Sequence, residues 1–205
     1  MEDVLDLYAE PPDPLRPRVC FDELPYQLVS ETRPPMAARP GRARRVDYEY
    51  KREGTANLFM VAQPEDGWRH VDVTERRTSR DFALQMQALV DVHFPEAHVI
   101  RVVLDNLNTH TLARLYEVFP PAEARRIAKK LEFHPTPKHG SWLNMAEIEL
   151  GVLSGGCLDR RIGDITTLGQ EVAAWEGPRN TKHASINWRF TTDHARVKLH
   201  RLYPS

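Results

Sequence analysis

The chain has 205 residues, of which 41% are hydrophobic and 28% charged, a balance typical of one globular domain with its own core. The net charge of −1 does not by itself indicate a nucleic-acid binder, nor does it exclude one, because a basic patch can be offset by an acidic site. No run approaches the ~20 apolar residues that span a bilayer, and no signal-peptide pattern opens the sequence. We therefore expect a cytoplasmic protein with no membrane partner.

Two cysteines, Cys20 and Cys157, offer neither the spacing of a metal finger nor a disulfide framework. Both lie in apolar contexts, which predicts buried thiols in a reducing compartment.

The N-terminal part begins with a short amphipathic piece, residues 1–10, followed by a proline-rich linker at 11–17. The apolar run Val19–Phe21 then predicts a buried strand that ends at Asp22. An acidic residue at a strand's exit can lie in a functional crevice, or can simply end the strand.

Residues 31–46 carry several arginines among prolines and alanines without regular periodicity, which predicts an irregular basic loop. The loop is either solvated or an arm that contacts phosphates. Two strand-like runs, 56–62 and 68–73, flank a Pro/Asp/Gly turn and predict a hairpin.

The central part of the chain alternates helical and strand-like patterns. Thr78 or Ser79 caps a predicted helix that runs to about His93, and the β-branched run 99–104 is the clearest strand in the sequence. We expect the remaining elements to be helices at 112–118 and 122–130, a strand at 131–134, a helix that opens at Ser141, a helix at 165–176, irregular chain at 177–192 and a last helix at 193–202.

Three carboxylates occupy comparable places in this predicted α/β order. Asp22 and Asp105 follow strands, and Glu147 sits at the edge of the apolar face of the helix that opens at Ser141. Strand exits in an open α/β sheet form the usual site crevice, so we expect the three acids to converge. Oxygen ligands suit Mg²⁺ or Mn²⁺, and two such ions catalyse phosphoryl transfer on nucleic acid. Read alone, Glu147 is more often a solvated helix glutamate beside Glu149.

The segments around these acids resemble the acidic motifs of DDE transposases. Val19–Glu23 is similar to the first motif, Asp105–His110 to the second and Ser141–Glu147 to the third. The closest resemblance is to bacterial insertion-sequence transposases related to the mariner elements, and it covers about residues 18–205.

The resemblance implies an RNase H-like fold, a mixed sheet with flanking helices. It implies that Asp22, Asp105 and Glu147 are the catalytic triad, which binds two Mg²⁺ or Mn²⁺ ions, cleaves DNA at transposon ends and joins the freed 3′-hydroxyl to target DNA. The residues that it places near the site, to position DNA or the acids, are Asn108, His110, Lys138, His139 and Asn144.

The sequence departs from the family in two respects. Family members carry an N-terminal helix-turn-helix region that recognises transposon ends, so residues 1–17 are interpreted as a connecting segment and 18–205 as the catalytic domain. End recognition is then absent or comes from a separately encoded part, and two protomers are expected to pair the ends on DNA. The spacing from Asp105 to Glu147 is also longer than is usual in mariner relatives, and a helical segment within 120–130 accounts for this.

Two other functions stay open: a catalytically silent remnant or partner subunit, and a general nuclease acting on RNA–DNA hybrids. No zinc motif accompanies the histidines. The tryptophans are expected to be packing residues, with Trp142 as the single candidate for a base-stacking role.

Overall fold

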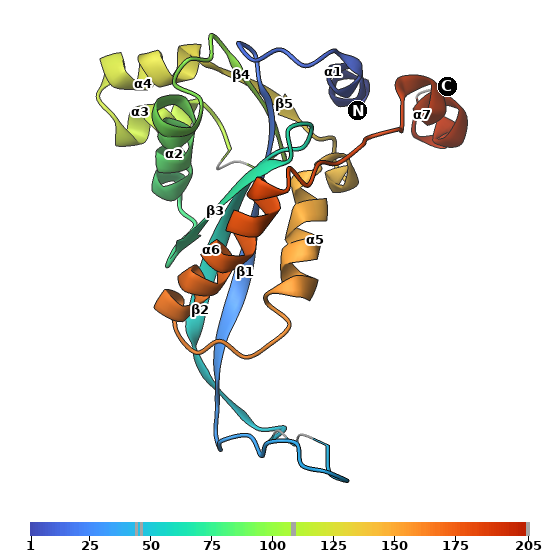
Figure 1. Ribbon diagram of the computed structural model, residues 1–205. Coiled ribbons are helices and arrows are strands. Elements are labelled where there is room, and N and C mark those ends of the chain that lie inside the picture. The colour runs from blue at the N-terminus through green and yellow to red at the C-terminus, as the bar shows by residue number, and fades with distance from the viewer. Residues whose placement is uncertain (44, 46, 108–109, 204–205) are drawn as a thin grey trace.

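The computed structural model describes residues 1–43, 45, 47–107 and 110–203. Figure 1 shows a central twisted sheet with helices on both sides. The elements are α1 (Glu2–Ala9), β1 (Arg18–Glu31), β2 (Tyr50–Gln63), β3 (Trp68–Thr74), α2 (Ser79–Ala88), the π-helical turn η1 (Leu89–His93), β4 (Ile100–Leu104), α3 (Ala113–Val118), α4 (Pro121–Lys129), β5 (Leu131–Pro135), the 3₁₀ turn η2 (Ser141–Leu143), α5 (Ala146–Gly156), α6 (Ile165–Thr181), α7 (Thr192–Lys198) and the 3₁₀ turn η3 (His200–Leu202).

The described strands form one mixed sheet in the order β3-β2-β1-β4-β5. The first three strands along the chain are antiparallel neighbours, whereas β4 runs parallel to β1 and β5 runs parallel to β4. Parallel neighbours need crossover connections, which α2 with η1 supplies before β4 and α3 with α4 supplies before β5. The expected hairpin, the strands at 99–104 and 131–134 and the helices around residue 120 are confirmed.

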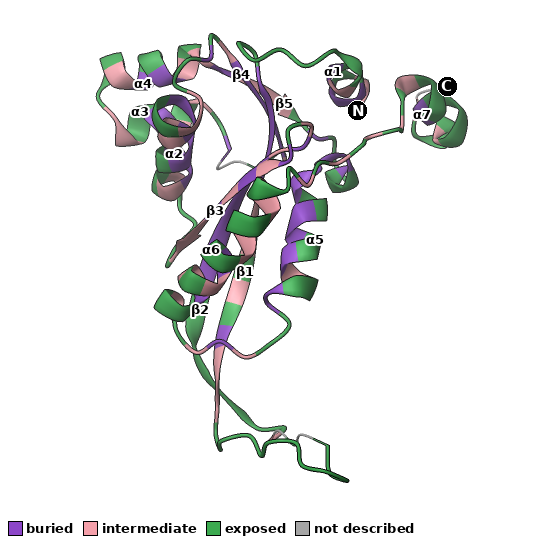
Figure 2. Ribbon diagram, in the orientation of Figure 1, coloured by how far each residue is buried: buried purple, intermediate pink, exposed green. Residues whose placement is uncertain are grey.

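Each face of the sheet carries its own apolar core. Side chains from α1, α5, α6 and α7 pack on one face, and side chains from α2, η1, α3 and α4 pack on the other. Because successive side chains of a strand alternate between faces, β1 contributes Cys20 to the first core and Phe21 to the second. Figure 2 shows the buried sheet between these two helical layers.

The first strand extends far beyond Asp22, so the expectation that Asp22 ends it is wrong. β1 continues to Glu31 because β2 pairs with it from Cys20 to Glu31, with Asp22 opposite Met60. The two strands project beyond the sheet as an exposed arm (Figures 1 and 2). Glu31 belongs to β1, so the irregular stretch begins later than the expected 31–46. Strand β2 begins at Tyr50, earlier than the expected strand 56–62.

Two helix boundaries also differ from expectation. Ser141 does not cap a helix: it starts the short turn η2, and α5 begins only at Ala146. The last part of α6, up to Thr181, lies in the stretch expected to be irregular and continues through Pro178. Asn180 explains this extension, because its side chain exchanges hydrogen bonds with the backbone of Arg69 on β3, at 2.9 and 2.8 Å.

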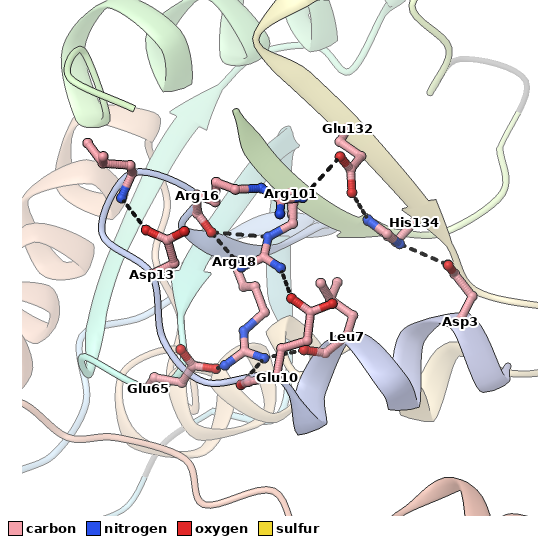
Figure 3. A network of polar contacts seen from close by, with 11 residues as sticks. Asp3, Leu7, Glu10, Asp13, Arg16, Arg18, Glu65, Arg101, Glu132 and His134 are labelled. Carbon is pink, nitrogen blue, oxygen red and sulfur yellow. Dashed lines mark hydrogen bonds and ion pairs between the residues drawn. The ribbon is translucent and has the colours of Figure 1, made fainter. Parts of the chain in front are cut away.

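The N-terminal helix α1 packs into the same core as α5. Val4, Leu5 and Leu7 are at most 3% exposed. Figure 3 shows the polar contacts that hold the following turn: the buried Arg18 donates to the backbone oxygen of Leu7, and the buried Arg101 pairs with the carboxylate of Glu10. Helix α1 is therefore joined to the sheet by both apolar and charge-assisted contacts.

No helix within the described part of the chain is long and apolar enough to cross a membrane. Both cysteines are buried and unpaired, as expected. Burial raises the pKa of the Cys20 thiol to about 11, so this thiol is protonated and unreactive at neutral pH.

Candidate active site

Asp22 on β1 lies level with Asp105, which directly follows the neighbouring parallel strand β4. The register of β1 and β4 pairs Cys20 with Val103, and two further residues along each strand lead to Asp22 and Asp105. Cys20 and Val103 both face the core under α5. Because side chains alternate with a period of two, both aspartates are directed to that same face, at the end of the sheet where β4 stops.

Glu147 reaches this region from α5. The helix packs its apolar side, including Ala146 and Leu150, on the sheet, and Glu147 in its first turn stays exposed. Glu147 and Asp22 line one pocket of about 340 Å³. Asp105 lines a second pocket, of about 360 Å³, with the turn that follows β5.

Asn144 connects the elements that carry two of these acids. Its side-chain amide, which is 1% exposed, donates a hydrogen bond of 2.8 Å to the backbone oxygen of Phe21, the residue before Asp22. Its side-chain oxygen accepts from the backbone N–H of Ala146, the residue before Glu147, at 3.2 Å. This bridge explains why the helix begins after Asn144 rather than at Ser141.

The three carboxylates interact electrostatically. Burial, together with the negative charges of Asp105 and Glu147, raises the pKa of Asp22 to about 7, against the hydrogen bond from the Glu23 backbone N–H. Such a shift is typical of like charges that share a site. A divalent cation between them would relieve this repulsion.

His110 is buried beside Asp105. Its Nδ1 lies 2.5 Å from Oδ1 of Asp105, and its ring stacks on Phe82 at a centroid distance of 4.8 Å. On its other side, Nε2 lies 4.0 Å from Glu23, which also pairs with Arg77 at 3.3 Å. His110 is thus held between aromatic rings with one nitrogen facing the aspartate.

The other residues expected near the site have different positions. Lys138 and His139 are exposed on the turn between β5 and η2, and both line the pocket that contains Asp105. His139 adopts a left-handed backbone conformation with φ of 62°, which bends the turn sharply. Asn108 lies outside the described residues.

The donor set fits a hard divalent cation. Asp22, Asp105 and Glu147 supply only oxygen atoms, the ligand type that Mg²⁺ and Mn²⁺ prefer. Among the described residues, no three His, Cys, Asp or Glu side chains stand close enough together to hold a metal ion as they are placed. The acids therefore share one face and repel one another without forming a closed ligand cage.

Two features of the site's surroundings were not foreseen. Glu149 is 2% exposed and lies 3.1 Å from both Arg69 on β3 and Arg179 on α6. Two residues along a helix are about 200° apart, so Glu149 holds α5 by the side opposite Glu147. Glu23, adjacent to Asp22, pairs with Arg77 from the loop before α2. In the sequence, the only indication that these two glutamates differ is their spacing of two positions. That spacing does not show which of the two carboxylates is buried.

Comparisons with known proteins agree with this architecture. The family model described as DDE superfamily endonuclease matches residues 17–169. The solved Mos1 mariner paired end complex with Mn is similar, with a TM-score of 0.58 and 16% identity over 88% of this chain and 54% of that one. The Mos1 Strand Transfer Complex is similar too, with a TM-score of 0.57 and 14% identity over 83% of this chain and 50% of that one. No curated protein matches the chain in sequence.

These findings confirm the expected RNase H-like mixed sheet with flanking helices. The chain spans about half the length of the Mos1 chains that it matches. Since the family model covers most of the chain, including the strand of Asp22, the strand before Asp105 and the helix of Glu147, this chain belongs to the DDE superfamily endonucleases.

Proposed function

We propose that this chain is the catalytic domain of a transposase that cleaves DNA and joins the freed 3′-hydroxyl to a target, in the transposition of an insertion sequence. The observation that carries the proposal is that Asp22 on β1 feels the charges of both Asp105, which follows β4, and Glu147 on α5, and shares a pocket with Glu147. Acidic groups are rarely gathered in this way without a cation to bind.

The proposed catalytic residues are the three acids, which hold two Mg²⁺ or Mn²⁺ ions. Bound there, the ions supply an activated water or 3′-hydroxyl and stabilise the leaving oxygen of the phosphodiester. Asn144 keeps Asp22 and Glu147 at a fixed separation through its hydrogen bonds to both elements. His110 orients Asp105 through the contact at its Oδ1. Such outer contacts commonly determine how well a metal ligand is placed.

Lys138 and His139 are the proposed phosphate contacts. Both are exposed on the rim of the Asp105 pocket, where a cationic side chain can meet the DNA backbone without a desolvation penalty. Asn108, which follows Asp105 in the second motif, is assigned a near-site role by the resemblance alone.

We assign residues 18–205 to the catalytic domain and residues 1–17 to a connecting segment, whose helix α1 packs into the core of that domain. Recognition of the transposon ends is proposed to come from a helix-turn-helix part, which can be separately encoded, and two protomers are proposed to pair the ends. The named relatives support a DNA partner, because they are paired end and strand transfer complexes of a transposase.

The test is cleavage of supercoiled plasmid and of the DNA that flanks the chain's own gene, in Mn²⁺. We expect wild-type protein to nick or transfer strands and Asp22→Asn, Asp105→Asn and Glu147→Gln to lose this activity. Glu96→Gln is the matched control, because Glu96 is an exposed carboxylate that precedes β4, at the opposite end of this strand from Asp105. Equal activity in wild type and Asp105→Asn would refute the proposal.

The same assay separates the alternatives. Cleavage of an RNA–DNA hybrid with no cleavage of DNA would indicate a general RNase H-like nuclease. A folded wild-type protein that cleaves neither substrate, even with a helix-turn-helix partner added, would indicate a catalytically silent remnant.

A further inference from the structure

Trp142 is a large apolar side chain that the core does not use. It belongs to η2, between the catalytic Asp105 pocket and α5, and it is 43% exposed. Its neighbour Leu143 is fully buried, so the turn holds the indole outward rather than leaving it on a loose loop. Tryptophan is enriched at binding interfaces, because it combines a large apolar ring with a polar N–H group.

The indole is supported from behind by other aromatic rings. The ring of Trp188 stacks on it at a centroid distance of 6.3 Å with 17° between the planes, and Phe190 meets it edge-on at 5.5 Å. The indole N–H of Trp188 donates to the backbone oxygen of Phe190 at 2.7 Å. The exposed part of Trp142 is therefore a flat surface whose orientation is set before any ligand arrives, which lowers the entropy lost on binding.

A hollow connects Trp142 with the catalytic region. Trp142 lines a pocket of about 220 Å³ together with the turn residues Pro137, Lys138 and His139. The same three turn residues line the pocket of Asp105. The two pockets therefore share one turn, and a ligand that follows this turn can extend from Asp105 to the indole.

The charge along this path fits a nucleic-acid strand. Lys138 and His139 are exposed on the shared turn, and none of the described residues that line the Trp142 pocket carries a carboxylate. A cation beside an exposed aromatic ring is a combination that binds single-stranded nucleic acid, with a phosphate on the cation and a base on the ring.

We propose that Trp142 is a stacking platform for an unpaired base at the end of the DNA strand that enters the catalytic groove. This inference rests on the proposed function, because it takes DNA as the ligand of the Asp105 pocket. By removing the terminal base from its stack, the platform would let the backbone at that position approach the acids. An apolar protein segment in the same pocket is the competing occupant.

The test is equilibrium binding to two oligonucleotides in Ca²⁺, one a blunt duplex and one with a short unpaired 3′ end. We expect wild-type protein to bind the unpaired end more tightly. Trp142→Ala should weaken binding to the unpaired end about 10- to 100-fold, the range reported for loss of one stacked base, and change blunt-duplex binding little. Trp142→Phe should retain most of the preference, and Tyr116→Ala, which removes another exposed aromatic on α3, should retain all of it.

A second readout follows the base itself. With 2-aminopurine at the unpaired position, stacking on the indole quenches its fluorescence in wild type and Tyr116→Ala but not in Trp142→Ala. Unchanged preference and quenching in a Trp142→Ala protein with a wild-type melting temperature would overturn the inference. Cleavage that depends on Asp105 would still stand in that case, so failure of the platform is distinguishable from failure of the proposed function.

Discussion

Nδ1 of His110 lies 2.5 Å from Oδ1 of Asp105, and the histidine ring is buried between Phe82 and Phe21. The contact joins one proposed metal ligand to the core on the opposite face of the sheet, the face of α2. The position of Asp105 therefore depends on packing as well as on the strand that it follows.

Replacing His110 should separate the effect of its ring packing from the effect of the nitrogen that faces Asp105. His110→Phe keeps an aromatic ring between Phe82 and Phe21 but removes the nitrogen that faces Asp105, so we expect the fold to survive and Mn²⁺-dependent cleavage to fall about 10- to 100-fold. His110→Ala should lose stability as well, because it leaves a cavity. Activity measured beside thermal unfolding distinguishes the two, and full activity in His110→Phe would show that the nitrogen has no role.

Glu149 should be a stability residue, in contrast to Glu147 two positions away. Removing its charge leaves Arg69, which is 1% exposed, without its partner, and breaking a buried pair of this kind typically costs about 3–5 kcal/mol. We expect Glu149→Gln to lower the free energy of unfolding by an amount of this order. Glu147→Gln, on the exposed side of the same helix, should stay within about 0.5 kcal/mol of wild type while losing activity. Similar unfolding free energies for both variants would contradict the structure of this helix.

The N-terminal helix should behave as part of the folded unit. Leu5 on α1 is 1% exposed, whereas Leu15 in the linker is 46% exposed. Leu5→Ala should therefore cost about 2–5 kcal/mol in chemical denaturation, and Leu15→Ala should cost little. Equal small effects would mean that α1 is not packed as described.

A histidine pair far from the acids should make stability depend on pH. The hydrogen bond to Glu176, at 3.3 Å from Nδ1, raises the pKa of His70 against the opposing effect of burial. Its other charged neighbours are Asp72, which also raises the pKa, and His93, whose ring lies 4.7 Å away and whose own pKa is lowered by burial. A raised pKa means that the folded state holds the proton more tightly than the unfolded chain does.

The stabilisation from His70 is therefore complete below its unfolded pKa of about 6.5 and is lost as pH rises through the higher folded value. We expect the difference in unfolding free energy between wild type and His70→Asn to be larger at pH 6 than at pH 8.5. Glu176→Gln should reduce this pH dependence in the same way. A difference that grows toward alkaline pH would reverse the assigned sign.

The periodicity of apolar residues was sufficient to predict the elements whose packing neighbours are close along the chain. The hairpin, the strand before Asp105 and the helices on either side of Pro120 were all predicted, because their apolar patterns and turn residues are local. The placement of the acids on one face also follows from strand alternation once the order of the sheet is known.

The misplaced boundaries have long-range causes. Asp22 lies inside a strand because β2 pairs with β1 far beyond it, which no local pattern at Val19–Phe21 reveals. The start of α5 is set by a hydrogen bond from Asn144 to Phe21, and the end of α6 by the contacts of Asn180 with Arg69. The burial of Glu149 was not predictable either, since its partners Arg69 and Arg179 lie far from it in sequence.

Direct titration of Mn²⁺ by electron paramagnetic resonance tests the central claim, that Asp22, Asp105 and Glu147 form one divalent-metal site. We predict saturable binding to the wild-type protein and at least tenfold weaker binding in each of Asp22→Asn, Asp105→Asn and Glu147→Gln, with Glu96→Gln unchanged. Wild-type binding that all three acid variants retain would place the metal elsewhere and contradict the account.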